Sequence, residues 1–552
     1  MKEKNPAILQ TVTNVSTKVA NALVLVPTGL DTGYKRKNRG TNVTKIHKTK
    51  LVLLSATAFF AATSAHAQVA DTWAITGDVT VTAANTADTT TVDPVTPGVV
   101  AGVDTALISA GFRNSISGSA VGSSASSSFT SVNNSATGGA AALTVDGSLI
   151  VAAGNGSAVL NSTDVLNGAT IASGSSNSIS LAAVGSSASV SGSTTLTDVA
   201  GAATSGDAYS YTANSLVVSS GSLEGDVEVD QGSLTGGNDN TVSLLLATGF
   251  TAPVITEGSG NSISVAGVGS SASASFSATV GGDGSDTTFD LSLADGVAIS
   301  AANSDNGNVA VGLVDAVGIV GPQINGGNAN SISAAAVGSS ASFSLASSTF
   351  GGGVVTEFNS TVGDLTVDSF NGANTVGIGA DAAGGQTAIS DAVIAGAGNG
   401  NSISASVVGS SASVSYANTV YDTGNGAAGG AVSFAAITVN STNNGTISNG
   451  TDLANAGSID GGSRNSISIA GIGASASQSF SVTSYAGDAA ITGVGSTAEG
   501  GITLAAFNTG VVGVSGGLSN PSIADGFSNS ISAAAVGASA SQSVTRTLVG
   551  AN

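Results

Sequence analysis

Cysteine is absent from this chain of 552 residues, so no disulfide can stabilise it. Positive charge is almost confined to the segment 1–67, which holds ten of the 13 lysines and arginines and both histidines. From residue 68 onward only Arg113, Arg464 and Arg546 face 32 acidic residues, a formal charge of 3 − 32 = −29. Such a polyanion is repelled by nucleic acid and by anionic lipid, so neither is an expected partner.

The same absences argue against catalysis. Beyond residue 67 there is no histidine, lysine or cysteine to serve as general base or nucleophile, and a serine triad lacks its base. Carboxylates remain, and Asp226, Glu228 and Asp230 alternate along one expected strand face. We interpret them as a solvated or cation-binding face and predict that the chain is not an enzyme and needs no cofactor. A carbohydrate-active β-helix enzyme with a carboxylate pair is the alternative.

The N-terminal region has the pattern of an export signal. Lys45, Lys48 and Lys50 precede an apolar stretch at 51–62, and Ala65-His66-Ala67 forms a small-x-small cleavage site. We predict a leader over 1–67 that is removed after Ala67, and a secreted product found extracellularly or at a bacterial cell surface. The apolar stretch is too short to span a bilayer, so we expect no integral membrane span in the mature chain. Residues 1–44 fit either a misplaced start or an extended signal region.

One phrase recurs seven times in the remaining chain, which we divide into an N-terminal β segment at 68–112 and a repeat region at 113–552. It reads Asn-Ser-Ile-Ser, three small residues, Val or Ile, Gly, Ser or Ala, and Ser-Ala-Ser. The phrase has no acid, base, thiol or imidazole, so it is suited to packing and hydrogen bonding. Its structural residues are Asn114, Asn177, Asn261, Asn330, Asn401, Asn465 and Asn529, with Ile116, Ile179, Ile263, Ile332, Ile403, Ile467 and Ile531 two positions later.

Alternating patterns outside the phrase indicate strands. Phe289, Leu291 and Leu293 alternate before Asp295-Gly296, and Val297 and Ile299 resume the alternation afterwards. An Asp-Gly pair between such runs is a turn signal. The abundant Gly and Ser also fit disorder, but the content of Val, Ile and Leu favours a fold. We find no convincing amphipathic helix and predict an all-β protein.

The phrase itself predicts a strand, a turn and a second strand, because its Gly permits a bend or bulge. After the Gly, alternate residues share one face. In the third copy these are Ala272, Ala274 and Phe276, and the opposite face carries serines.

Spacing indicates the architecture. The intervals between successive phrases are 63, 84, 69, 71, 64 and 64, and four of them fall within one position of a multiple of 21. Further asparagines lie 21 or 22 residues before a repeated asparagine: Asn155, Asn240, Asn308, Asn444 and Asn508. We predict a repetitive β-solenoid of stacked β-arches with coils of roughly 20 residues, three or four to a module, in which Asn stacks over Asn. The alternative is a string of small β-sandwich modules.

Two Gly-rich acidic loops are candidates for calcium. Gly281-Gly-Asp283-Gly-Ser-Asp286 and Gly236-Gly-Asn-Asp239 are similar to the loops of calcium-binding solenoids, although neither has the full nonapeptide. Asp283 and Asp286 are therefore candidate metal ligands. The competing interpretation is an acidic turn on a soluble surface.

The phrase Gly260-Asn261-Ser-Ile-Ser and its relatives resemble the repeats of curlin-type functional amyloid subunits. Curlin repeats carry glutamine at regular positions, whereas only Gln478 and Gln542 fall in the motif of this chain. The phrase is also similar to the rungs of trimeric autotransporter heads. The first resemblance implies stacked β-arches that self-associate. We therefore expect a secreted structural protein of the cell surface or extracellular matrix. The alternative is an adhesin that binds a host, glycan or surface ligand through the inserts between phrases.

Overall fold

The computed structural model describes residues 71–550 apart from short internal segments. The undescribed segments in that range are 86–88, 93–105, 136–140, 156–157, 163–167, 199–206, 222–241, 246–249, 283–286, 304–309, 315–318, 352–355, 373–374, 381–388, 397, 423–427, 450–452, 456, 487–494 and 514–519. The predicted leader over 1–67 therefore lies outside the described residues.

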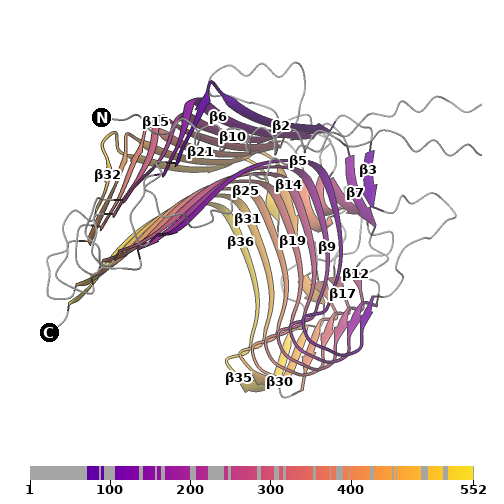
Figure 1. Ribbon diagram of the computed structural model, residues 1–552. Coiled ribbons are helices and arrows are strands. Elements are labelled where there is room, and N and C mark those ends of the chain that lie inside the picture. The colour runs from indigo at the N-terminus through magenta and orange to yellow at the C-terminus, as the bar shows by residue number, and fades with distance from the viewer. Residues whose placement is uncertain are drawn as a thin grey trace, which may run out of the picture. The chain divides into compact units, whose positions relative to one another are not determined.

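The described residues form an all-β solenoid without a helix, which confirms the predicted fold class. Its strands pair in parallel with the equivalent strands of the coils before and after (Figure 1). A string of β-sandwich modules is thereby excluded. The prediction of three or four coils to a module is wrong, because one coil takes up the whole interval between two phrases. We number the coils 1 to 7: 71–135, 141–198, 207–282, 287–351, 356–422, 428–486 and 495–550.

Each coil ends in a strand of 21 residues that begins one position after the repeated Asn. We call these the motif strands: β5 (Ser115–Ser135), β9 (Ser178–Asp198), β14 (Ser262–Gly282), β19 (Ser331–Gly351), β25 (Ser402–Asp422), β31 (Ser466–Ala486) and β36 (Ser530–Gly550). Equivalent residues of neighbouring motif strands pair with each other along nearly the whole length. The repeated phrase is thus the part of each coil that fixes its register on the next.

The largest sheet lies opposite the motif strands. It contains β1 (Asp71–Thr76), β2 (Val79–Asn85), β6 (Ala141–Asn155), β10 (Asp207–Gly221), β15 (Thr287–Asn303), β20 (Thr356–Val362), β21 (Leu365–Asn371), β26 (Ala428–Phe434), β27 (Ile437–Asn443), β32 (Gly495–Ala498) and β33 (Ile502–Asn508).

Three further sheets complete the coils. The first holds β3 (Thr89–Val92), β7 (Ala158–Ser162), β11 (Val242–Leu245), β16 (Ala310–Val314), β22 (Thr375–Ala380), β28 (Thr446–Asn449) and β34 (Val512–Gly513). The second holds β12 (Phe250–Thr251), β17 (Ile319–Val320), β23 (Ile389–Ser390) and β29 (Leu453–Asn455). The third holds β4 (Leu107–Ile108), β8 (Thr170–Ile171), β13 (Val254–Ile255), β18 (Gln323–Ile324), β24 (Val393–Ala395), β30 (Ser458–Ser463) and β35 (Ser522–Phe527).

A motif strand does not break into two strands at its Gly, contrary to the prediction. It runs on as one curved strand (Figure 1). The residues that face inward change at the Gly. In β14 every second residue is buried from Ile263 to Gly269, then Ser270 is buried as well, and the alternation continues through Ala272. Two consecutive inward residues shift the pattern by one, as in a β-bulge. Ala272, Ala274 and Phe276 share the buried face, as predicted.

The Asp-Gly pairs are corners of the sheet rather than hairpin turns. The chain keeps its direction through Asp295-Gly296, since β20 and β21 both run parallel to β15. Leu293 pairs with Val362 and Val297 pairs with Leu365, so coil 4 has one more residue than coil 5 at this corner. The extra residue makes a β-bulge, and Gly296 adopts a φ of 110° there. The alternation predicted the strands correctly, but the turn signal gave the wrong connection.

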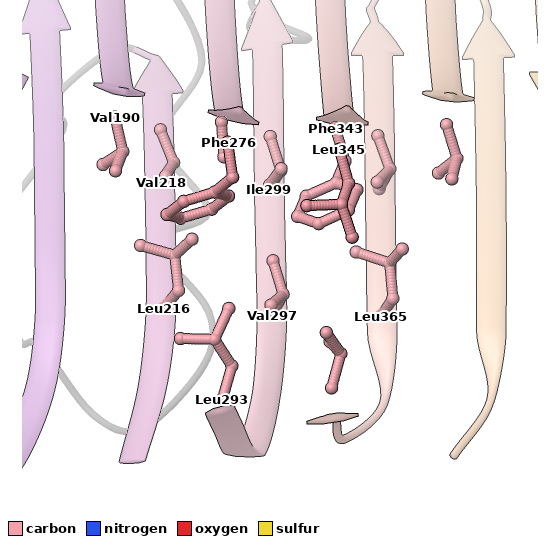
Figure 2. Packing of buried hydrophobic residues seen from close by; sticks show 14 of the residues in the cluster. Val190, Leu216, Val218, Phe276, Leu293, Val297, Ile299, Phe343, Leu345 and Leu365 are labelled. Carbon is pink, nitrogen blue, oxygen red and sulfur yellow. The ribbon is translucent and has the colours of Figure 1, made fainter. Parts of the chain in front are cut away.

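Two separate apolar cores fill the coils. The first packs the start of the motif strands, such as Ile263, against β8, β13 and β18, and the second packs their later part against the large sheet. Figure 2 shows part of the second core, where Phe276 and Phe343 lie against Val218 and Ile299. A Cβ on Gly192 would lie 2.7 Å from the Phe276 ring, so this glycine in coil 2 makes room for the phenylalanine of coil 3.

Candidate interaction surfaces at the coil ends

The seven repeated asparagines form one column in which side chains bond to backbone rather than to each other. The N–H of Asn261 donates to Oδ1 of Asn330 at 3.0 Å, and the Nδ2 of Asn330 donates to the carbonyls of Gly258 and Gly326 at 3.1 Å. The equivalent bond from backbone N–H to Oδ1 runs from Asn114 through every coil to Asn529, at 2.9–3.0 Å. Each asparagine after Asn114 thus accepts from one backbone group of the preceding coil and donates to another.

A second column joins side chain to side chain where the wall of the coil passes from one core to the other. The Nδ2 of Asn371 donates to Oδ1 of Asn443 at 2.7 Å, and Asn443 donates to Asn508 at 2.7 Å. Close by, Ser339 Oγ lies 2.8 Å from Ser369 Oγ. Hydrogen bonds along the stack make it favourable to bury these polar groups between two apolar cores.

This second column explains two of the upstream asparagines. Asn155 and Asn508 belong to it, and each precedes the repeated asparagine that closes its own coil, Asn177 or Asn529. The interval of 21 or 22 residues that led to the predicted coil length therefore separates two columns within one coil. Asn444 is not in the column: it follows the column member Asn443, is exposed and accepts a hydrogen bond from Thr509 Oγ1 at 2.6 Å. Asn240 and Asn308 lie outside the described residues.

The outward face of the motif sheet is built from serine. Five ranks of serine run through all seven motif strands; the rank that contains Ser273 is Ser126, Ser189, Ser273, Ser342, Ser413, Ser477 and Ser541. The inward position next to it varies from Val190 to Phe343 and Gln478. Outward residues are therefore more uniform than packing residues, so this face carries little that distinguishes one coil from another.

The last coil leaves inward residues uncovered. Ile523 is 48% exposed, whereas its partner Ile459 in coil 6 is 0% exposed. Val544 is 69% exposed, against 6% for its partner Phe480. The pairing of these strands ends at β36 and β35, which are terminal in their sheets within the described residues. The last coil therefore offers an apolar cross-section and free strand edges.

The first coil also exposes apolar side chains. Its inward Ile108 and Ala125 are buried, but Leu107, Phe112, Val121 and Val132 are exposed, with Phe112 at 61%. β4 and β5 are the terminal strands of their sheets, so this end also presents unpaired strand edges within the described part of the chain.

Several predicted site residues lie outside the described part of the chain. Asp283, Asp286 and the 236–239 loop fall in undescribed segments, as do Asp226, Glu228 and Asp230. Among the described residues no group of three histidine, cysteine or acidic side chains could hold a metal ion. Arg113 lies with its guanidinium carbon 4.7 Å from the centroid of the Phe112 ring, in a cation–π contact.

No protein-family model, curated protein or solved structure matches this chain. Within the described residues, no helix has the length and apolar character needed to cross a membrane.

Proposed function

We propose that this chain is an exported bacterial structural protein of the cell surface or extracellular matrix, and that it self-associates through its stacked β coils. The supporting observation is the exposed apolar cross-section of coil 7. Solenoid proteins that remain monomeric cover their terminal repeats with polar caps, since a bare coil exposes core residues and unpaired backbone. In the described part of the chain, coil 7 exposes the apolar side chains of Ile523, Phe527 and Val544.

The composition supports a structural role. The repeated residues are small and uncharged, and both polar columns serve to hold coils together. Charge opposes assembly, because the chain beyond residue 67 carries a formal −29. Repulsion between such subunits is screened by salt. We therefore expect assembly to accelerate between low and physiological ionic strength.

The test is electron microscopy and analytical ultracentrifugation of the secreted product over a range of protein and salt concentrations. Filaments or sheets with a repeat of about 4.8 Å along the stacking direction are expected. A product that stays monomeric at high concentration and high salt, with no such repeat, would refute the proposal.

A further inference from the structure

We propose that coil 7 of one copy binds coil 1 of the next, in register and in the same direction, so that the joint continues the solenoid. This inference rests on the proposed function and specifies its interface. Coil 1 ends in β5, a motif strand of the same length as that of every other coil, which can therefore pair with β36 as an eighth coil would. The partner is thus a second copy of this chain.

The asparagine column gives the joint its direction. Inside the chain each asparagine N–H donates to the asparagine of the following coil. At the ends, the N–H of Asn529 has no acceptor and the Oδ1 of Asn114 has no donor among the described residues. Coil 7 therefore presents the free donor and coil 1 the free acceptor. Two copies of coil 7 would present donor to donor, so only a head-to-tail joint extends the column.

A glycine carbonyl of coil 7 supports the same head-to-tail direction of the joint. The Nδ2 of each internal asparagine donates to a glycine carbonyl of the preceding coil, as Asn529 donates to Gly462 at 3.3 Å. Asn114 makes the bond within its own coil, to Ala110, and within the described residues it makes no bond to a preceding coil. In the joint, the carbonyl of Gly526 occupies the position that Gly462 has for Asn529.

One column differs between the ends and the interior in a way that favours this joint. Phe112 in coil 1 and Phe527 in coil 7 occupy the same position of the coil and are 61% and 71% exposed. The coils between them carry small polar residues there: Ser175, Ser259, Asn328, Asn399 and Ser463. Two exposed phenylalanines that occur only at the two ends would stack on each other at the joint, where their apolar surface leaves water.

The motif strands at the joint oppose association very little. β5 contains no charged residue and β36 contains only Arg546. The acidic charge of the chain therefore acts between whole subunits rather than across the two motif strands, and salt can screen it.

Cysteine cross-linking tests the register, since the chain has no cysteine of its own. Ser115 and Ser530 are exposed outward residues, and inside the chain this rank pairs directly, as Ser466 pairs with Ser530. In S115C/S530C the two cysteines lie six coils apart within one chain, about 29 Å, which is far beyond disulfide reach. Oxidation of filaments should then give a ladder of covalent multimers.

The controls separate this joint from other modes of assembly. S115C/S539C keeps both ends but moves one cysteine nine residues along β36, and should give no multimers. S530C alone should give no dimers, because coil 7 does not meet coil 7. Filaments that yield S530C dimers, or no multimers from S115C/S530C, would overturn this joint and leave the proposed function standing. A chain that never assembles would sink the proposed function itself.

Phenylalanine substitutions test the contact. Phe112→Ser and Phe527→Ser insert the residue that coils 2, 3 and 6 already carry there, so the fold should persist, as checked by unchanged circular dichroism and melting. Each should raise the critical concentration for assembly about tenfold. The control Phe350→Ser removes an exposed aromatic from the middle of the solenoid and should leave that concentration unchanged. An equal critical concentration for wild type and F527S would overturn the phenylalanine contact.

Discussion

The backbone N–H of Asn261 donates to the side-chain Oδ1 of Asn330, 69 residues later in the chain, at 3.0 Å. This bond crosses from coil 3 to coil 4, and the same bond recurs at every coil boundary although the interval between the bonded asparagines varies from 63 to 84. The coils therefore keep register through the asparagine and its motif strand, while the rest of the coil varies.

Removing one internal asparagine should destabilise the solenoid substantially. Asn330→Ala leaves the N–H of Asn261 without its acceptor and the carbonyl of Gly326 without its donor, at a site that is 1% exposed. The carbonyl of Gly258 loses one of two donors, because it also accepts from the N–H of Asn328. We expect a loss of about 2–4 kcal/mol in the free energy of unfolding, since buried polar groups would be left unpaired.

The matched control is Asn114→Ala, which removes the same side chain from the exposed end of the column. Its cost should stay below about 1 kcal/mol because water can replace the lost bonds. Urea unfolding of both variants below the assembly concentration compares them. Equal losses at the two positions would contradict the role given to the buried column.

The sequence predicted the all-β class and the stacking of asparagine over asparagine because both depend on local, repeated features. The phrase recurs at seven places, and a stacked repeat brings equivalent residues together. The coil length was mispredicted since two columns, one through Asn508 and one through Asn529, lie within the same coil. An interval in a sequence does not tell whether two similar residues stack or lie on different walls of the same coil.

The motif glycine should resist substitution for steric reasons. A Cβ on Gly269 would lie 2.5 Å from the Nδ2 of Asn303 and 2.5 Å from the carbonyl oxygen of Gly338, a backbone atom that cannot move aside easily. Gly269→Ala should therefore cost about 1–3 kcal/mol of stability, as overpacked cores do.

The control for this variant is Gly513→Ala, where the nearest atom to the new Cβ is the carbonyl oxygen of Ile447 at 3.8 Å. Its melting temperature should stay within a degree or so of wild type, because surface substitutions away from packed sites change stability little. The steric explanation would be wrong if Gly269→Ala melted with the control.

Two phenylalanines on β19 should respond differently to truncation. Phe343 is 1% exposed and contacts the rings of Phe276 and Phe434 at centroid distances of 6.3 and 6.5 Å. Phe350 is 42% exposed and stacks on Tyr421 at 5.1 Å. Phe343→Ala should cost about 3–5 kcal/mol, and Phe350→Ala should cost about 1 kcal/mol. Chemical denaturation measures both, and a larger loss at Phe350 would contradict the assignment of the second core.

The inward position of Phe343 shows what alternation alone cannot predict. Period-2 patterning identified the buried face of each motif strand, but not the pairing of a large residue in one coil with a small one in the next. Gly192 lies beside the Phe276 ring only because these two residues pair across two neighbouring coils. Such compensation depends on which phrases lie in neighbouring coils, and the predicted coil length of roughly 20 residues placed other residues between them.

Alkaline pH should weaken the fold through Tyr416. Burial raises the pKa of this phenol to about 12 from an ordinary value of 10.0, and nearby Asn418 and Ser347 offset the rise only in part. Between pH 10 and 12 the unfolded chain loses the proton while the folded chain keeps it, so stability falls as pH rises. The contribution is about 2–3 kcal/mol at pH 12.

The variant Tyr416→Phe removes this titration and should unfold with a shallower dependence on pH above 10. A hydrogen bond with the stacked Tyr485 also raises the pKa of Tyr421, but Tyr421 lies at the surface, so Tyr421→Phe should keep most of the wild-type dependence. Denaturation midpoints at pH 8, 10 and 11.5 for the three proteins measure the difference. Parallel curves for wild type and Tyr416→Phe would show that the buried phenol does not control alkaline stability, because a group whose folded pKa is raised must steepen the wild-type curve in this window.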